Sequence, residues 1–120
     1  MQKKTLVLGA SPKPERYSYK AVKMLQEYQH PVVAVGFRES VIDTIPIHKG
    51  EPIFEGVDTL TLYLGPQNQK NIYHYILKIN PKRIIFNPGT ENSELMNLAK
   101  ENGIEVEVAC TLVLLSTNQY

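Results

Sequence analysis

The sequence predicts an α/β fold, a three-layer sandwich in which helices cover both faces of a five-stranded parallel sheet. The chain has four apolar runs, and those at residues 5–8 and 32–35 lack polar alternation, as do parallel strands that are buried on both faces. Each run leads to a glycine, and the intervals between these glycines are 27, 29 and 24 residues, about one strand with its returning helix. Residues 1–120 are predicted to form a single domain, because a chain of this length has no room for two cores. The four glycines are Gly9, Gly36, Gly65 and Gly89.

The first strand, helix and strand are predicted from short-range patterns. Residues 5–8 are a continuous run that favours a buried strand. Residues 18–29 carry apolar side chains at helical spacing, and Ser18 is placed to cap the exposed amides of the first turn. Pro31 ends this helix, and residues 32–35 form the second buried strand.

The middle of the chain is predicted to be less regular. Residues 37–58 contain two prolines and two glycines, so we expect an irregular crossover with at most one short helix near residues 39–43. Residues 60–64 form the third predicted strand. Residues 68–79 follow as a helix, because three isoleucines fall on one helical face before an Asn-Pro pair.

The last part of the chain returns to the strand-helix pattern. Residues 83–86 are the fourth predicted strand, and a helix begins at Asn92 or Ser93. Gly103 after Asn102 is typical of a left-handed helix exit, and residues 104–109 form the fifth strand. A short turn of helix and a loose end are expected after it.

The predicted strand order, numbered along the chain, is 3-2-1-4-5 with right-handed crossovers. This order reverses between the strands at residues 5–8 and 83–86, which places the loops after Gly9 and at residues 87–89 on either side of one crevice. Open parallel sheets bind ligands at that edge. The alternative is that each glycine only permits a strand-to-helix turn.

The composition excludes several classes of function. Thirteen basic and twelve acidic residues give a net charge of +1, which predicts no general attraction to nucleic acid or to a membrane surface. A single cysteine excludes an internal disulfide and a cysteine-based zinc cluster, and favours a reducing cytoplasm. The apolar run near the start of the sequence is too short for a signal peptide or a membrane span. The sequence leaves the assembly open: a homodimer that buries the apolar residues 112–115 and a complex with a partner enzyme are both compatible with it.

Basic residues near two strand ends indicate an anionic ligand. Lys13 and Arg16 precede a helix start, where Ser18 and free amides favour a pyrophosphate, with Tyr17 beside them. The G-x-G-x-x-G fingerprint of dinucleotide binding is absent. Arg38 stands where NAD-binding proteins have an acid, which suits a ribose phosphate, as in NADP or coenzyme A. The alternative is a solvated arginine paired with a nearby glutamate.

Four segments resemble the small stand-alone CoA-binding proteins, which have a Rossmann-like fold, and the amino-terminal CoA-binding domain of the succinyl-CoA synthetase α subunit. The resemblance extends from residue 4 to residue 116. Many members of that family have the sequence Val-Asn-Pro after the second strand, where this chain has Val-Gly-Phe. The second, phosphohistidine-bearing domain of the synthetase has no counterpart here, so the resemblance does not imply its reaction. The four segments are residues 5–12, 16–19, 87–92 and 109–113.

The resemblance implies that Gly9, Ala10 and Ser11 hold phosphate oxygens, that Ser18 assists at the helix start, and that Arg38 lies near the adenosine phosphate. It further implies that residues 65–66 and 87–89 line the rest of the groove. Together with the residues chosen from the sequence alone, the predicted cofactor-binding residues are Gly9, Ala10, Ser11, Lys13, Arg16, Tyr17, Ser18, Gly36, Phe37, Arg38, Gly65, Pro66, Asn87, Pro88 and Gly89.

No catalytic or metal-binding constellation is predicted. The three histidines fall on separate segments, and Cys110, at the ligand edge, is either a buried small residue or a thiol that reacts with a bound thiol. The expected function is therefore binding of coenzyme A or an acyl-CoA without identifiable catalytic groups. The alternatives are an NADP-binding oxidoreductase or nucleotide sensor, and a non-catalytic subunit of a CoA-dependent enzyme.

Overall fold

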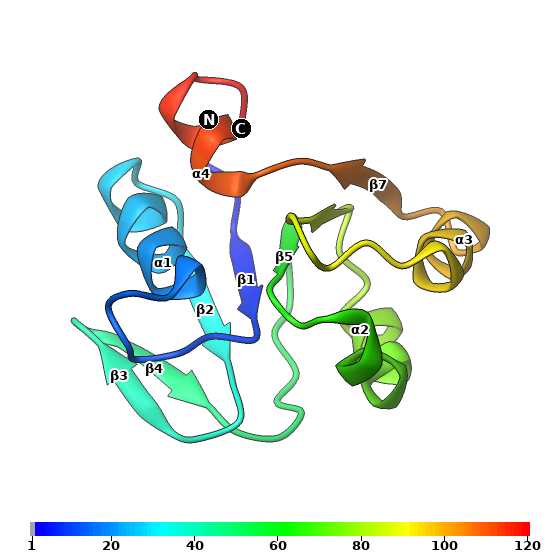
Figure 1. Ribbon diagram of the computed structural model, residues 1–120, viewed down its shortest axis with the longest axis horizontal. Coiled ribbons are helices and arrows are strands. Elements are labelled where there is room, and N and C mark those ends of the chain that lie inside the picture. Colours follow the sequence, from blue (N-terminus) through cyan, green and yellow to red (C-terminus); the bar gives the residue numbers. More distant parts are fainter. Residues whose placement is uncertain (1) are drawn as a thin grey trace.

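A computed structural model describes residues 2–120 and shows a mostly parallel sheet of seven strands with helices on both faces (Figure 1). The strand order is β3-β4-β2-β1-β5-β6-β7, and all neighbours are parallel except β3 and β4. The strands are β1 (Thr5–Leu8), β2 (Val32–Val35), β3 (Ser40–Ile42), β4 (Ile45–His48), β5 (Thr59–Leu62), β6 (Arg83–Phe86) and β7 (Glu105–Val108).

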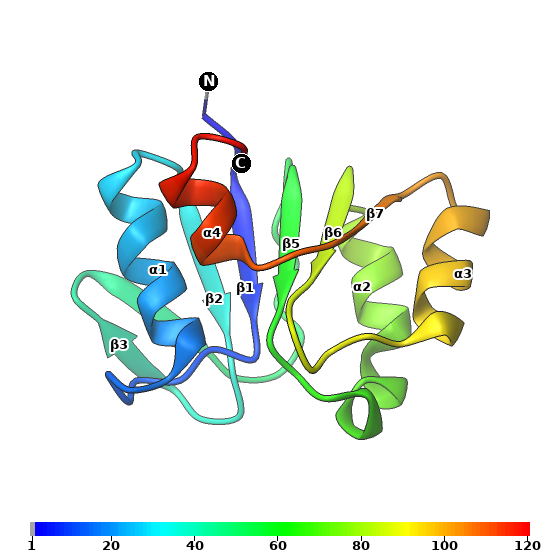
Figure 2. The ribbon, with the colours of Figure 1, turned by 45° about the horizontal axis from the view of Figure 1, so that its top comes forward.

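Two helices cover each face of the sheet, and each face has its own apolar core (Figure 2). On one face, α1 and α4 pack on Val7 and Ala34. On the other, α2 and α3 pack on Leu60, Leu62 and Ile84. This two-sided burial is the reason why β1 and β2 carry continuous apolar runs, and in β5 even the alternating Thr59 and Thr61 are buried. The helices are α1 (Tyr17–Glu27), α2 (Tyr73–Ile79), α3 (Ser93–Glu101) and α4 (Thr111–Ser116).

The predicted strand order is wrong in one respect. The strand predicted at residues 60–64 is β5, and it lies between β1 and β6 rather than outside β2. The order therefore reverses between β1 and β5. The connection from β4 carries no helix: Phe54 and Val57 pack into the core of α2 and α3, and the Tyr75 hydroxyl donates to the Pro52 carbonyl at 2.6 Å. This extended segment takes the place of a crossover helix on that face.

The region predicted as an irregular crossover contains an antiparallel hairpin, which is why the sheet has seven strands and not five. The short helix predicted near residues 39–43 is not formed. Ile42 and Ile47 are buried while Val41 is exposed, so the side chains follow the alternation of a strand. Asp43 adopts a left-handed conformation (φ 53°) in the turn, which an aspartate tolerates. The hairpin extends the sheet beyond β2 through β4.

The helix boundaries differ from the prediction at several ends. Arg16, not Ser18, occupies the N-cap of α1, and Ser18 is buried within the first turn. The helix predicted over residues 68–79 is two 3-10 turns, η1 (Pro66–Asn68) and η2 (Lys70–Ile72), followed by α2. The predicted start of α3 is confirmed, with Asn92 as its cap, and the short turn of helix expected after the last strand is α4.

The carboxyl-terminal end is not loose as predicted. The Tyr120 ring packs against His30 with the two ring planes tilted by 58°, and it lies under the Arg83 guanidinium, whose central carbon is 4.7 Å from the ring centre. Its hydroxyl shares a short hydrogen bond with Thr5. The last residues therefore pack against the amino ends of β1 and β6. No helix in residues 2–120 is long and apolar enough to cross a membrane.

Candidate functional site

One cavity of about 710 Å³ lies at the carboxyl edge of the sheet, where four strand-following loops meet. The loops follow β1, β2, β5 and β6, so the cavity spans the point where the strand order reverses. Its lining residues are Gly9, Ala10, Ser11, Pro12, Lys13, Arg16, Tyr17, Ser18, Phe37, Arg38, Glu39, Ser40, Tyr63, Leu64, Gly65, Pro88, Gly89 and Thr90.

Most of the residues predicted from sequence to bind a cofactor line this one cavity. Gly36, Pro66 and Asn87 do not. Sequence reasoning missed six lining residues. Glu39 and Ser40 belong to the hairpin that was not predicted, whereas the Tyr63 and Leu64 positions could have been found as the residues directly before a strand-end glycine. The other two are Pro12 and Thr90.

The loop after β1 is held by backbone bonds that the sequence does not reveal. The amides of Gly9 and Ala10 both donate to the Val35 carbonyl at 2.9 Å, so neither is free for a phosphate in this structure. A Cβ on Gly36 would lie 2.3 Å from the Ala10 carbonyl oxygen. Gly36 therefore permits close contact between the ends of β1 and β2 and acts as a packing residue rather than a lining residue. That Gly9, Ala10 and Ser11 hold phosphate oxygens stays a prediction, and in this structure the backbone amides of the first two are bonded within the fold.

The start of α1 offers free donors to the cavity instead. The first amides of an α-helix have no partner within the helix. Arg16 at the N-cap makes no side-chain cap, and the first turn has no acidic residue. The Ser11 hydroxyl turns back to accept the Lys13 amide at 3.2 Å. Since Arg16, Tyr17 and Ser18 line the cavity, the uncapped start of α1 and the positive end of its dipole lie beside a space that an anion can enter.

The charges in the lining are unevenly distributed. Lys13, Arg16 and Arg38 come from the loops after β1 and β2, and Glu39 is the one acid among the described lining residues. In contrast, the loops after β5 and β6 contribute no charged side chain to the described lining. The cavity has a cationic half and an uncharged half.

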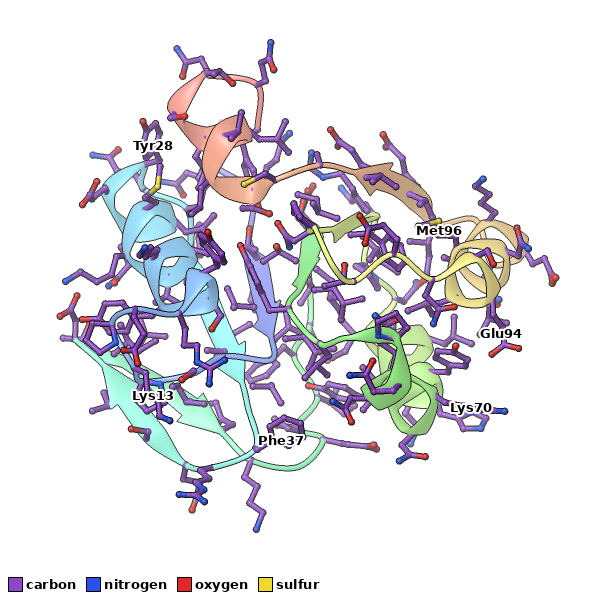
Figure 3. The ribbon with its side chains drawn as sticks, in the orientation of Figure 1. Lys13, Tyr28, Phe37, Lys70, Glu94 and Met96 are labelled. Carbon is purple, nitrogen blue, oxygen red and sulfur yellow. The ribbon has the colours of Figure 1, made fainter. Side chains whose placement is uncertain are left out.

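Two exposed aromatic rings flank the cationic half. Tyr17 is 67% exposed and Phe37 is 70% exposed, which is unusual for aromatic side chains in a folded domain. The Lys20 ammonium lies 5.3 Å from the centre of the Tyr17 ring. In Figure 3, Lys13 and Phe37 lie on the side of the molecule that carries β3 and β4, far from Lys70 and Glu94 beside α2 and α3. Flat, exposed rings at the rim of a cavity are suited to stacking on a planar ligand.

The uncharged half is built on a rigid loop after β6. Asn87 is buried, and its amide nitrogen donates to the Thr61 hydroxyl at 2.7 Å and to the Leu62 carbonyl at 2.9 Å. Its amide oxygen accepts the Thr111 amide at 2.9 Å. The side chain thus fastens β5, β6 and α4 from within. Gly89 follows with φ 90° and open space around its Cα, and its amide donates to the Glu91 carboxylate at 2.8 Å.

The reactive side chains nearest the cavity are the phenol of Tyr63 and the thiol of Cys110. Burial raises the pKa of Tyr63 to about 12, and the nearby Thr61 and Thr111 hydroxyls bond each other rather than the phenol. Tyr63 is therefore a neutral phenol at pH 7. Cys110 is half-buried at the N-cap of α4 and does not line the cavity. No group of three or more metal-ligating side chains occurs within residues 2–120.

A family and several solved structures are similar to this chain. The model of a family described as a CoA binding domain matches residues 3–116. No curated protein matches the chain. A crystal structure of an uncharacterized protein is 48% identical, with a TM-score of 0.97 and coverage of 100% of this chain and 99% of the other. A hypothetical protein from Pyrococcus horikoshii OT3 is 25% identical, with a TM-score of 0.85 and coverage of 97% and 83%. A protein from Thermus thermophilus, 23% identical with a TM-score of 0.81 and coverage of 99% and 91%, shares the fold.

Proposed function

The chain belongs to the CoA binding domain family, and we propose on that premise that it binds coenzyme A in the cavity at the carboxyl edge of its sheet. The observation that carries the proposal is the division of the lining into a cationic and an uncharged half. Coenzyme A has the same division, since its adenosine phosphates are anionic and its pantetheine arm is neutral. No catalytic role is proposed.

The cationic half suits the nucleotide. The free amides of α1, with Lys13 and Arg16, would bind the pyrophosphate, because a helix start and two cations favour the same anion. Arg38 would form a forked contact with the phosphate on the ribose. The exposed rings of Tyr17 and Phe37 would stack on the adenine. The Gly9 and Ala10 residues would line this half through van der Waals contact, since their amides are already bonded.

The uncharged half suits the pantetheine arm. Its lining residues come from the ends of β5 and β6, where Tyr63, Leu64 and Pro88 supply apolar surface and Gly89 leaves open space. The neutral pantetheine arm can enter this half without burying a charged side chain, which would cost free energy. An acyl group attached to the thiol would extend from this half, which makes an acyl-CoA a candidate ligand of the same site.

A second candidate is NADP, which one observation favours. Arg38 in the loop after β2 suits a 2′-phosphate as well as a 3′-phosphate. The uncharged half then has to take a nicotinamide ribose rather than a pantetheine chain. Coenzyme A is preferred because the family match and the uncharged half agree with it.

Thermal unfolding with coenzyme A, dephospho-coenzyme A, NADP and NAD tests this proposal. A ligand at about a hundred times its dissociation constant adds roughly 2.7 kcal/mol of stability. We expect coenzyme A to raise the unfolding temperature most, and dephospho-coenzyme A less, because it lacks the phosphate assigned to Arg38. The Arg38→Ala variant should lose this difference, whereas Lys78→Ala, which removes an exposed cation on α2, should keep it. A shift with NADP and none with coenzyme A would refute the proposal.

A further inference from the structure

We propose that Gln69 is a positioning residue for the pantetheine half of the cavity: its buried side-chain amide fixes the loop after β5 against the loop after β6. This inference rests on the proposed binding of coenzyme A. The two loops are the ones that supply the uncharged half of the lining, including Leu64 and Thr90. Gln69 itself does not line the cavity, so it acts through the two loops that it joins.

The geometry of the bridge is specific. Gln69 is 0% exposed, and its amide nitrogen donates to the Leu64 carbonyl at 2.8 Å and to the Thr90 carbonyl at 2.8 Å. Both hydrogens of the amide group are thereby used on two lining residues from different loops. Neither carbonyl belongs to the turn that contains Gln69. The bridge therefore sets the distance between the loop after β5 and the loop after β6, which together form the uncharged half of the cavity.

The bridge is held in turn by the start of α3. The amide oxygen of Gln69 accepts a hydrogen bond of 2.9 Å from the side chain of Asn92, which also caps α3. The same Asn92 nitrogen donates to the Tyr73 hydroxyl at 2.8 Å, and Tyr73 donates to Glu94 at 3.0 Å. Each polar group of the Gln69 amide therefore has a partner, and its orientation is fixed by the network.

The local turn does not need this side chain. The backbone closes the turn on its own, because the Asn68 amide donates to the Gly65 carbonyl at 2.9 Å and the Gln69 amide donates to the Pro66 carbonyl at 3.1 Å. A buried glutamine costs free energy unless all its polar groups are paired. Its full pairing across two cavity loops indicates a role in holding those loops rather than in forming the turn.

The nucleotide half is built separately. Its cations and free amides come from the loops after β1 and β2, and no hydrogen bond of the Gln69 network reaches those loops. Disturbing Gln69 should therefore weaken contacts with pantetheine while leaving contacts with the nucleotide. A change that only lowered the stability of the whole fold would weaken the binding of both parts of the ligand to a similar extent.

Binding of coenzyme A and of adenosine 3′,5′-diphosphate, its nucleotide fragment, to Gln69→Glu tests the proposal by titration calorimetry. The carboxylate has nearly the same shape but places negative oxygen against two carbonyl oxygens. We expect about tenfold or more weaker binding of coenzyme A and less than about a threefold change for the fragment. Gln119→Glu is the matched control, because it adds the same charge at an exposed position near the amino ends of the strands, away from the cavity, and it should leave both affinities nearly unchanged.

Equal losses for the two ligands in Gln69→Glu, or no loss for either, would overturn the role of Gln69. Failure of the wild-type protein to bind coenzyme A would overturn the proposed function instead, so the two failures are distinguishable. If Gln69→Glu does not fold, the side-chain NH₂ signals of Gln69 in nuclear magnetic resonance spectra of the wild-type protein decide the question. Coenzyme A should shift these signals and the nucleotide fragment should not, and equal shifts with both ligands would contradict the proposal.

Discussion

The imidazole of His30 is held neutral by its surroundings. Its Nδ1 accepts a hydrogen bond of 2.9 Å from the Lys3 amide, and its ring packs in a tilted arrangement against Tyr120, with the ring centroids 4.9 Å apart. Burial lowers the pKa of His30 below its usual 6.5, and the positive charges of Lys3 and Arg83 lower it further. A proton on Nδ1 would abolish the hydrogen bond that joins the start of the chain to the end of α1. His30 lies at the opposite end of the sheet from the cavity.

Stability should fall as the pH falls through the range of histidine titration. The unfolded chain binds the proton of His30 more readily than the folded chain, so the contribution is full above the unfolded pKa of about 6.5 and is lost below it. We expect His30→Asn, whose amide oxygen can still accept the Lys3 amide, to reduce the loss of thermal stability between roughly pH 8 and pH 5. His74→Asn, at an exposed position on α2, should retain the wild-type pH profile. Identical profiles for wild type and His30→Asn would show that another group is responsible.

Single residues also show where sequence reasoning reaches its limit at the site. Gly36 was predicted as a ligand contact because it ends a strand, but its small size is required by the Ala10 carbonyl, 2.3 Å from where a Cβ would lie. Asn87 was predicted to line the groove, but its side-chain amide forms buried hydrogen bonds with Thr61 and Thr111 instead. Both depend on contacts between segments that are far apart in the sequence. By contrast, Lys13 and Arg38 could be placed at the cavity, because strand ends in a parallel sheet share one edge.

At the scale of secondary structure elements, Asn87 is the buried junction of β5, β6 and α4. Three hydrogen bonds of its side chain link the Thr61 hydroxyl, the Leu62 carbonyl and the Thr111 amide. The Thr61 and Thr111 hydroxyls, 2.7 Å apart, close the network. The short helix α4 has no side-chain cap at its start, so Asn87 supplies the partner for its first amide. The loop that carries Pro88 and Gly89 begins at this junction.

Replacement of Asn87 by leucine should be strongly destabilising. A side chain of similar volume fills the space but leaves the Leu62 carbonyl and the Thr111 amide buried without partners. Each unpaired buried group costs roughly 1–3 kcal/mol, so we expect a loss of roughly 2–5 kcal/mol in urea unfolding. Asn97→Leu, the same change at an exposed position of α3, should cost less than about 1 kcal/mol. A similar small loss for Asn87→Leu would mean that the network is not a major source of stability.

The elements that the sequence failed to predict share one physical cause. The β3 and β4 strands are only three and four residues long, and their alternation is interrupted by a turn and by Pro46. Pro46 is tolerated because β4 pairs with β2 only through Ile47 and His48. The β1, β5 and β6 strands are no longer than β4, but all their residues are buried and their apolar runs could be recognised, whereas the partly exposed β3 and β4 carry no such run. The strand order depended on how residues 49–58 cross the sheet, and their extended packing on α2 carries no periodic signal.

At the scale of the whole molecule, a nearly neutral protein places its excess positive charge at one edge. The net charge is +1, yet Lys13, Arg16 and Arg38 line one half of a cavity with a single acid among its described lining residues. The described residues contain two ion pairs, Lys23 with Asp43 and Arg83 with Glu107, and neither involves these cations. Attraction of an anionic ligand is therefore a local property of the cavity and is not produced by the charge of the protein as a whole.

This local field makes a prediction about salt. The Debye length falls from about 10 Å at 0.1 M salt to about 3 Å at 1 M, so cations at an open cavity lose their attraction for phosphates over this range. We expect the affinity for coenzyme A, measured by titration calorimetry, to fall steadily with added sodium chloride. Lys13→Gln should bind more weakly at low salt and respond less to salt, because one of the lining charges is gone. Lys100→Gln, which removes an exposed charge at the end of α3, should keep the wild-type dependence. If all three proteins respond alike, the net charge and not the cavity controls the attraction, and the assignment of the cationic half to the nucleotide phosphates is wrong.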